Sequence, residues 1–579
     1  MKRYISNLFA GLIMVGLTLP VTSFAQNADE VFRAAGSPHN PKVNIAFNRY
    51  YTSEGLAELS KKIAAAHPDL VKRISIGKSY EGRDLWMLQI TNFKKGIADR
   101  KPGYYIDGNI HSNEIQGAEI SIYTAWYLTE NYGDVDYITD MLDNRIFYIV
   151  PTINPDARNH YMQQANTGSS PRSGMMPLDD DRDGLVDEDG LDDLDGDGSV
   201  TSMRRKSEYG DFIVDPLDPR KMLQIGPDDV TTAQRYEMLG SEGIDNDGDG
   251  RVNEDRPGVY DPNRDWAWKW QPDYIQRGAL MYPFSAPENR AVADFVMAHP
   301  NIAGAQSFHN SGGMILRGPG AEEDLATYNR ADLRIYDAIG MKGQKMLPGY
   351  RYLTVYKDLY SVFGGELDWF YGSRGIYTFT NEIFTSFAYY KNERGGRDEG
   401  YDFDKELLAG DAFTPWAPYN HPTYGEVEIG GFKKNFGRAT PGFLLEEELH
   451  RNMSFALYHA HHMPLLSIDK VTEKDLGGGL REITAVIKND RMMPTHASQD
   501  LKYKIERPDY VTISGVDVQV GMIVQDLDLG LSTEQKVDPA KMVLENIPGN
   551  STVTLRWIVS GKGTPKITVD SAKGGIVTN

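Results

Sequence analysis

The chain has 579 residues, of which 40% are hydrophobic and 25% are charged, values typical of a globular protein with more than one folded unit. Its formal net charge of −21 argues against nucleic acid or an anionic membrane as a partner. The sequence contains no cysteine, which excludes disulfide bonds and a lipid-bearing thiol within it.

Residues 1–25 predict a signal peptide. Two basic residues precede an apolar stretch from Leu8 to Leu19, and the segment ends in a small-x-small cleavage pattern at Ala25. Pro20 breaks the apolar stretch, which is too short for a membrane anchor, and no other run is apolar enough to span a bilayer. We therefore expect a bacterial protein that is secreted or periplasmic, with a polar N-terminal segment at 26–45.

From residue 46 to about 466, runs typical of strands alternate with runs typical of helices. An amphipathic helix is expected within 47–68, a buried helix at 115–128 and a closing helix at 445–463. Strands are expected at 71–75, 85–90, 104–108, 146–153, 302–308 and 376–379. This order predicts an α/β domain with a mixed, mostly parallel twisted sheet flanked by helices, whose ligands bind beyond the carboxyl ends of the strands.

His111 and Glu114 lie where the strand at 104–108 gives way to the helix at 115–128. An imidazole and a carboxylate three residues apart at such a junction can face a common cation, and zinc accepts both kinds of ligand. His309 ends another buried strand and is a candidate third ligand. Two histidines and one carboxylate leave a coordination position open, which is typical of a catalytic site.

An acidic insert at about 177–255 contains three copies of a loop with alternate aspartates, a glycine and an apolar residue. This pattern is typical of loops that bind calcium through oxygen atoms, and three copies are hard to obtain by accident. The alternative is a solvated acidic linker. The candidate calcium ligands are Asp179, Asp181, Asp183, Asp187, Asp193, Asp195, Asp197, Asp245, Asp247, Asp249 and Asn253.

Residues 467–579 change to an alternating pattern with frequent turn signals, as in the run 483–487 and the run 555–559. No long helix is evident in this part of the sequence. We expect a separate all-β sandwich domain here, whose role the sequence does not indicate.

Five motifs follow one another along the chain. They are His111-Ser112-Asn113-Glu114, Asn154-Pro155-Asp156, Asp261-Pro262-Asn263-Arg264, Ser307-Phe308-His309, and a block from Tyr360 through Asp368-Trp369 to Thr380-Asn381-Glu382. In this order the chain, from roughly Tyr50 to Leu465 apart from the insert, resembles a zinc carboxypeptidase of the pancreatic carboxypeptidase A family.

The resemblance implies one catalytic zinc ion bound by His111, Glu114 and His309. It implies that Glu382 is the general base that takes a proton from the attacking water and returns it to the leaving amine. The oxyanion would be stabilised by Arg204 or by Arg205, of which Arg204 is preferred.

The resemblance also implies how the substrate is held. Asn263 and Arg264 would bind the terminal carboxylate, Tyr360 would close over it, and Leu367 would line the floor of the side-chain pocket. Because Leu367 is neutral, it argues against a basic terminal residue, although the adjacent Glu366 complicates that inference. Asn113 departs from the family, which has arginine there, and this leaves recognition of the rest of the peptide open.

The leading hypothesis is therefore an exopeptidase that removes the C-terminal residue of a peptide or protein with a free C-terminus. A zinc amidase acting on murein peptides would use the same chemistry. A non-catalytic peptide- or glycan-binding protein is a third hypothesis, which the intact Glu382 disfavours. Taken singly, each residue has an ordinary structural explanation, such as a surface ion pair between Arg264 and Asp261. The oligomeric state is left open.

Overall fold

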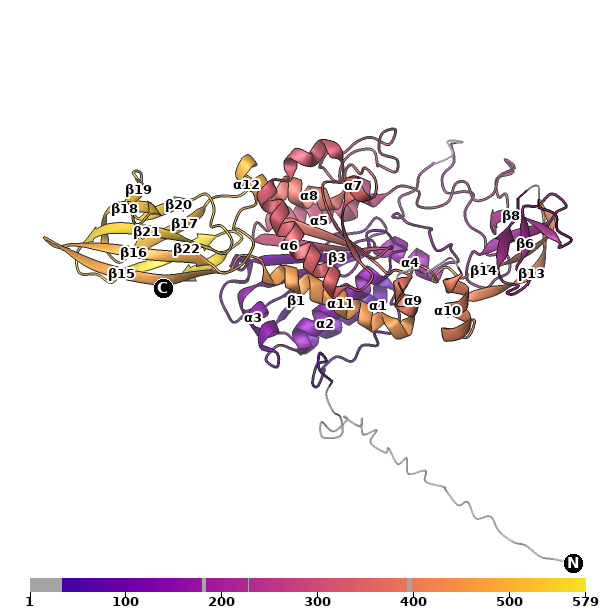
Figure 1. Ribbon diagram of the computed structural model, residues 1–579, viewed down its shortest axis with the longest axis horizontal. Coiled ribbons are helices and arrows are strands. Elements are labelled where there is room, and N and C mark those ends of the chain that lie inside the picture. The colour runs from indigo at the N-terminus through magenta and orange to yellow at the C-terminus, as the bar shows by residue number, and fades with distance from the viewer. Residues whose placement is uncertain (1–33, 180–183, 227–228, 393–397) are drawn as a thin grey trace, which may run out of the picture.

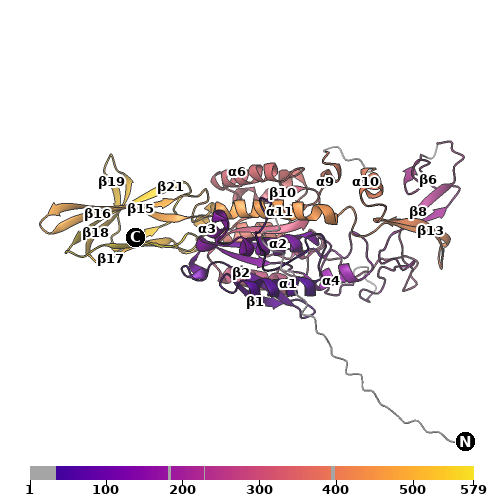
Figure 2. The same cartoon turned by 90° about the horizontal axis from the view of Figure 1, so that it is seen from below.

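The computed structural model describes residues 34–179, 184–226, 229–392 and 398–579. The expected signal peptide, residues 26–33 and the candidate ligands Asp181 and Asp183 lie outside the described residues. Within the described ranges, no helix combines the length and the apolar character needed to cross a membrane. The molecule is elongated, with a central α/β body, C-terminal β-sheets at one end and a smaller sheet at the other (Figures 1 and 2).

The central body is built on an eight-stranded mixed sheet. In spatial order its strands are β1 (Val71–Lys78), β2 (Asp84–Ile90), β4 (Ile146–Val150), β3 (Gly103–Gly108), β9 (Ile302–Asn310), β12 (Tyr377–Ile383), β10 (Met314–Arg317) and β11 (Arg351–Thr354). The pairs β4–β3, β3–β9 and β9–β12 are parallel, so the carboxyl ends of these strands lie together. The predicted α/β class is confirmed.

Helices cover both faces of this sheet because neighbouring strand residues point to opposite faces. One core contains Tyr104 and Ile106 of β3, and the other contains Tyr105. The first core is closed by α1 (Ser53–Ala66), α2 (Gln116–Glu130), α3 (Asp136–Asn144), α6 (Arg330–Met346) and α11 (Gly442–His461), and the second by α5 (Pro287–Ala298) and α8 (Glu366–Arg374). Shorter helices are α4 (Pro155–Gln163), α7 (Val355–Asp358), α9 (Phe387–Tyr390) and α10 (Glu399–Leu407).

The junction between β3 and α2 is unusually close, which explains two glycines. A Cβ atom on Gly108 would lie 2.5 Å from the carbonyl carbon of Gly117, and one on Gly117 would lie 2.7 Å from the carbonyl oxygen of Phe308. Every residue of α2 is buried. The start of α2 therefore packs directly against the ends of β3 and β9, and it fixes the loop that carries His111 and Glu114.

A six-stranded antiparallel sheet lies at the end of the molecule opposite the C-terminus (Figure 1). Its order is β13 (Phe413–His421), β14 (Gly425–Phe432), β5 (Ser202–Lys206), β8 (Arg235–Ser241), β6 (Phe212–Val214) and β7 (Met222–Gln224). The sequence did not predict it, because its strands from the acidic insert are short, and one of them, β5, pairs with the β13–β14 hairpin far along the chain, with Arg204 opposite Glu428.

The C-terminal region forms two sheets around one apolar core. The first contains β15 (Leu466–Gly477), β16 (Leu480–Asn489), β21 (Ser551–Ser560), β18 (Asp517–Asp526) and β19 (Leu531–Glu534), and the second contains β20 (Lys541–Leu544), β17 (Asp509–Ser514), β22 (Lys566–Ser571) and β23 (Gly575–Thr578). The all-β expectation is confirmed, with one short helix added, α12 (Ser498–Tyr503). This helix packs against α8 of the central body.

Candidate active site

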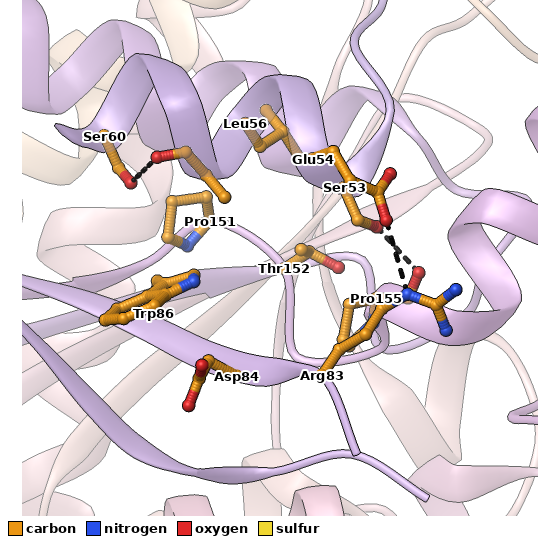
Figure 3. A pocket seen from close by; sticks show the side chains of 11 residues that line it. Ser53, Glu54, Leu56, Ser60, Arg83, Asp84, Trp86, Pro151, Thr152 and Pro155 are labelled. Atoms are coloured by element: carbon orange, nitrogen blue, oxygen red, sulfur yellow. Dashed lines mark hydrogen bonds and ion pairs between the residues drawn. The ribbon is translucent and has the colours of Figure 1, made fainter. Parts of the chain in front are cut away.

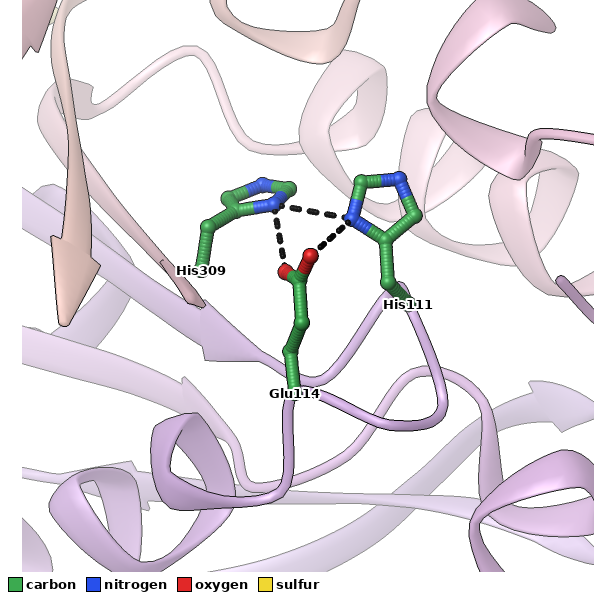
Figure 4. Close-up of side chains that lie close together, drawn as sticks. All are labelled: His111, Glu114 and His309. Carbon is green, nitrogen blue, oxygen red and sulfur yellow. Dashed lines mark hydrogen bonds and ion pairs between the residues drawn. The ribbon is translucent and has the colours of Figure 1, made fainter. Parts of the chain in front are cut away.

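His111, Glu114 and His309 converge at the carboxyl ends of β3 and β9 (Figure 4). His111 Nδ1 lies 3.0 Å from Glu114 Oε1, and His309 Nδ1 lies 3.0 Å from Glu114 Oε2. The two Nδ1 atoms are 3.2 Å apart. All three residues are buried. The structure thus brings together the three residues that the sequence suggested as zinc ligands.

The donor atoms of this cluster fit a cation. His111 Nε2 lies 2.8 Å from Asp261 Oδ1, and a carboxylate there favours the tautomer with the proton on Nε2 and a lone pair on Nδ1. That lone pair faces the Glu114 carboxylate and the other imidazole. Against the opposing effect of burial, His111 and His309 hold the pKa of Glu114 well below its usual range. Two nitrogen donors and a carboxylate match the ligands that zinc binds at about 2.0–2.2 Å.

Glu382 lies beside the cluster on β12, in register with His309 on the neighbouring parallel strand. It lines the same pocket as His111 and His309. Burial raises the pKa of Glu382 to about 7, and the negative charge of Glu114 adds to this effect. A carboxylate with such a pKa is suited to take up and release a proton near neutral pH.

The predicted substrate-binding residues Asn263, Arg264, Tyr360 and Leu367 line this pocket too. Arg264 Nη1 donates to the carbonyl oxygen of Asn263 at 2.8 Å, and its Nη2 lies 3.5 Å from Asp261 Oδ2. Arg264 Nε is buried and has no hydrogen-bond partner among the described residues. Tyr360 is 56% exposed, at the mouth of the pocket. The ion pair with Asp261 therefore orients Arg264 without using all of its donors.

Arg204 and Arg205 are not brought to this pocket. They lie on β5 in the six-stranded sheet, where Arg204 Nη2 pairs with Glu428 Oε2 at 2.6 Å and Arg205 Nη2 with Glu237 Oε2 at 2.7 Å. Arg204 also stacks on Tyr236 and Trp416, with its guanidinium carbon 4.5 and 4.2 Å from the ring centroids. The geometry therefore argues against an oxyanion role for either arginine, since both are engaged in the sheet.

Arg172 stands in the pocket instead. Its Nη1 donates to Asp261 Oδ2, and its Nη2 lies 3.7 Å from Glu114 Oε1. Arg172 was not predicted from the sequence, because the candidate arginines Arg204 and Arg205 lie within the acidic insert at 177–255, whereas Arg172 precedes it. The sequence did contain one signal for Arg172, because this arginine follows soon after the Asn154-Pro155-Asp156 motif.

Among the described residues, the acidic loops form two groups of carboxylates in which one oxygen atom of each residue lies within 4.8 Å of the others. One consists of Asp193, Asp195 and Glu242, and the other of Asp245, Asp247 and Asp249. Glu242, which follows β8, is fully buried, and burial raises its pKa to about 7. Glu242 was not among the calcium ligands predicted from the sequence.

The remaining candidate calcium ligands that the structure describes make other contacts. Asp197 accepts a hydrogen bond from Thr414, and Asp179 Oδ2 accepts one from the Gly184 amide at 3.1 Å. The amide of Asp187 donates to Asp255, and Asn253 Nδ2 donates to the Glu242 carbonyl. These four residues do not belong to either group of converging carboxylates.

Comparison with protein families gives two matches. Residues 56–176 and 236–390 match the family described as zinc carboxypeptidase, and residues 465–579 match a domain of unknown function, DUF8731. The first match contains the three clustered residues, Arg172 and Glu382. It omits most of the acidic insert, so the six-stranded sheet is largely outside it.

Individual relatives match shorter segments. A zinc carboxypeptidase from Saccharothrix mutabilis subsp. capreolus is 33% identical over 103 residues, which are 18% of this chain and 23% of that protein. A protein from Ajellomyces capsulatus named inactive metallocarboxypeptidase ECM14 is 30% identical over 132 residues, which are 23% of this chain and 22% of that protein. The chain thus spans less than a quarter of the length of these curated relatives.

Among solved structures, a carboxypeptidase A from Helicoverpa armigera is similar, with a TM-score of 0.42 and 16% identity. The superposition covers 72% of this chain and 75% of that one.

Proposed function

The chain belongs to the zinc carboxypeptidase family through residues 56–176 and 236–390, and from that premise we propose that it is a zinc-dependent exopeptidase. It removes the C-terminal residue from peptides or proteins with a free C-terminus. The observation that carries this proposal is one pocket that contains His111, His309, Arg264 and Glu382, with Glu114 joining the two histidines.

In this proposal His111, Glu114 and His309 hold the zinc ion. When bound, zinc acts as a Lewis acid that polarises a carbonyl group and makes water more acidic. The Asp261 carboxylate orients His111 through its 2.8 Å contact with Nε2. Glu382 accepts a proton from the attacking water and passes it to the nitrogen of the leaving residue.

Two arginines hold the substrate, one at its terminal carboxylate and the other at the carbonyl group of the scissile bond. Arg264 and the Asn263 amide bind the terminal carboxylate, for which the planar guanidinium is better suited than an ammonium group. Arg172 donates to the carbonyl oxygen as negative charge develops on it, the role that the sequence analysis gave to Arg204 or Arg205. Tyr360 is exposed enough to fold over the bound residue.

The pocket favours an apolar terminal residue. Its side-chain lining includes Leu316, Val355, Leu359, Val362 and Leu367. Among the nearby acids, Asp368 lines the pocket, where the Tyr328 hydroxyl donates to its Oδ1 at 2.8 Å and the Gly320 amide donates to its Oδ2 at 2.8 Å. A basic side chain would therefore lose water and find both oxygens of Asp368 already hydrogen-bonded.

Three substrates test the proposal: a blocked dipeptide with an apolar terminal residue, its C-terminally amidated twin, and a murein peptide. We expect chelator-sensitive cleavage of the free acid alone, and a loss of about 10²–10⁴-fold in kcat in the Glu382→Gln variant. The zinc content of the variant should equal that of the native protein, which separates loss of the base from loss of the metal.

Other outcomes would contradict it in distinguishable ways. Equal cleavage of the amidated twin would remove Arg264 from its role. Cleavage of the murein peptide alone would favour the amidase. No cleavage by zinc-loaded protein would favour a binding protein. One relative, from Ajellomyces capsulatus, is named an inactive metallocarboxypeptidase.

We also propose export and calcium binding. The leader-like residues 1–25 support secretion or transfer to the periplasm. The two carboxylate groups of the acidic insert support calcium, because clustered oxygen ligands suit this hard cation. In this reading, residues 46–466 are the catalytic domain with its insert, and residues 467–579 are a separate β-sandwich.

A further inference from the structure

A second cavity lies between α1, β2 and the segment that follows β4 (Figure 3). Its volume is about 160 Å³, and it shares no lining residue with the pocket that contains His111 and Glu382. In Figure 3, Trp86 reaches it from β2 and Arg83 from the turn before that strand, whereas Leu56 and Glu54 reach it from α1. The cavity is therefore a feature that the peptidase chemistry does not use.

Trp86 provides a fixed aromatic wall. The guanidinium group of Arg73 lies 3.3 Å from the centroid of its ring, and Arg73 Nε donates to Ser60 Oγ at 2.8 Å. Arg73 does not line the cavity, so it holds the indole without blocking the opening. Leu56, Pro151 and Pro155 complete the apolar part of the lining. The face of an indole ring is partly negative and attracts C–H groups. Such a wall therefore suits a rigid ligand ring that has C–H groups on one face.

The rim of the cavity is polar, and each of its charged groups already has a partner of opposite charge. Asp84 Oδ1 pairs with Lys78 at 2.7 Å, and Arg83 is shared by three carboxylates: its Nη1 pairs with Asp156 at 2.8 Å and with Glu81, and its Nε lies 3.4 Å from Glu54 Oε1. No charged group of the lining therefore lacks a counter-charge. Carboxylate oxygens and guanidinium nitrogens held in this way can still exchange hydrogen bonds with hydroxyl groups.

From these observations we propose that the cavity binds a neutral sugar in its pyranose form. The ring has an apolar C–H face for Trp86 and hydroxyl groups around its edge for Asp84, Glu54 and Arg83. The cavity volume accommodates one such ring rather than a long chain. Small-molecule sites commonly combine an apolar lining with a few polar groups that fix orientation, as this cavity does.

The test is calorimetric titration of the full chain with the methyl pyranosides of glucose, galactose and N-acetylglucosamine. N-acetyl-L-prolinamide serves as a neutral, peptide-like ring without hydroxyl groups. We expect at least one pyranoside to saturate with a Kd of about 1 mM, a value common for a small, shallow site. The prolinamide should not bind.

Two variants locate the binding. Ala57→Phe fills the cavity from α1 and should weaken the sugar by at least about tenfold, since the ligand and the new ring occupy the same space. Ala65→Phe adds the same side chain to an exposed position of α1 outside the cavity and should leave affinity unchanged. Trp86→Phe removes part of the aromatic wall and should weaken binding less than Ala57→Phe does.

The proposal is overturned if no pyranoside binds at millimolar concentration, or if Ala57→Phe and Ala65→Phe bind sugar equally. Binding of the prolinamide in place of every sugar would also overturn it, and would indicate a site for a peptide segment. Peptidase activity of the Ala57→Phe variant should remain native, which shows that the variant is folded.

Discussion

At the scale of single residues, the site depends on side chains that are held by partners outside the space where substrate would lie. Asp261 illustrates this, because it contacts His111, Arg172 and Arg264 at once. Burial alone would raise the pKa of Asp261, but Arg264, His111 and Arg172 hold it well below its usual range. One carboxylate thus orients a candidate zinc ligand and two candidate substrate-binding arginines.

The assignment of Arg172 leads to a direct prediction. Arg172→Ala should lower kcat by about 10²–10³-fold, because it removes a donor to the developing oxyanion. Arg204→Ala should leave kcat near the native value, since Arg204 is paired with Glu428 on β5. Steady-state kinetics on the blocked dipeptide measure both. The reverse ranking would restore the original assignment of Arg204, and melting temperatures of the two variants would control for unfolding.

The sequence predicted most of the candidate site because its key residues come directly after buried strands. His111, His309 and Glu382 each follow or end an apolar run, and parallel strands bring such ends together. Arg172 could not be placed in this way. It lies on a segment without regular structure, and the long insert after it disturbed the spacing on which the prediction depended.

At the scale of secondary-structure elements, local pattern was sufficient where an element packs against its sequence neighbours. The buried run that predicted a helix at 115–128 became α2, and alternation predicted β16 and β21. Local pattern was not sufficient to predict the six-stranded sheet. β5 has two adjacent arginines, and only pairing with the distant β14 and β8 makes it a strand.

His496, which precedes α12 and contacts Asp500 of that helix, provides a prediction about pH. Burial alone would lower the pKa of His496, but contacts with Asp500 at 2.8 Å and Asp509 at 3.3 Å raise it to about 9. A group whose pKa is higher in the folded state stabilises that state fully below its unfolded pKa of about 6.5. This contribution, about 3 kcal/mol, is lost as the pH rises through about 9.

Thermal unfolding between pH 6 and pH 10 checks this expectation. The native melting temperature should fall over this range more steeply than that of His496→Gln, which lacks the titrating group. His39→Gln, at an exposed histidine, should follow the native curve. Parallel curves for the native protein and His496→Gln would show that the ion pairs with Asp500 and Asp509 do not contribute.

At the scale of the whole molecule, three β-rich or mixed units lie in a row (Figure 1). The loops with Asp193, Asp195 and Asp245 connect the central body to the six-stranded sheet. Like charges held within 4.8 Å repel one another, and burial of Glu242 adds to the cost. A divalent cation in each group would remove this repulsion and fix the sheet relative to the body.

Calcium should therefore raise the melting temperature of the whole protein. A cation at 100 times its Kd that binds only the folded state stabilises that state by about 2.7 kcal/mol. The measurement uses protein stripped of metal, reloaded with zinc and then titrated with calcium chloride, with magnesium chloride for comparison. The double variant Asp245→Asn, Asp247→Asn should lose much of the shift, whereas Asp411→Asn with Asp528→Asn, at exposed aspartates outside the loops, should retain it. If the native melting temperature does not respond to calcium, the loops are a solvated linker.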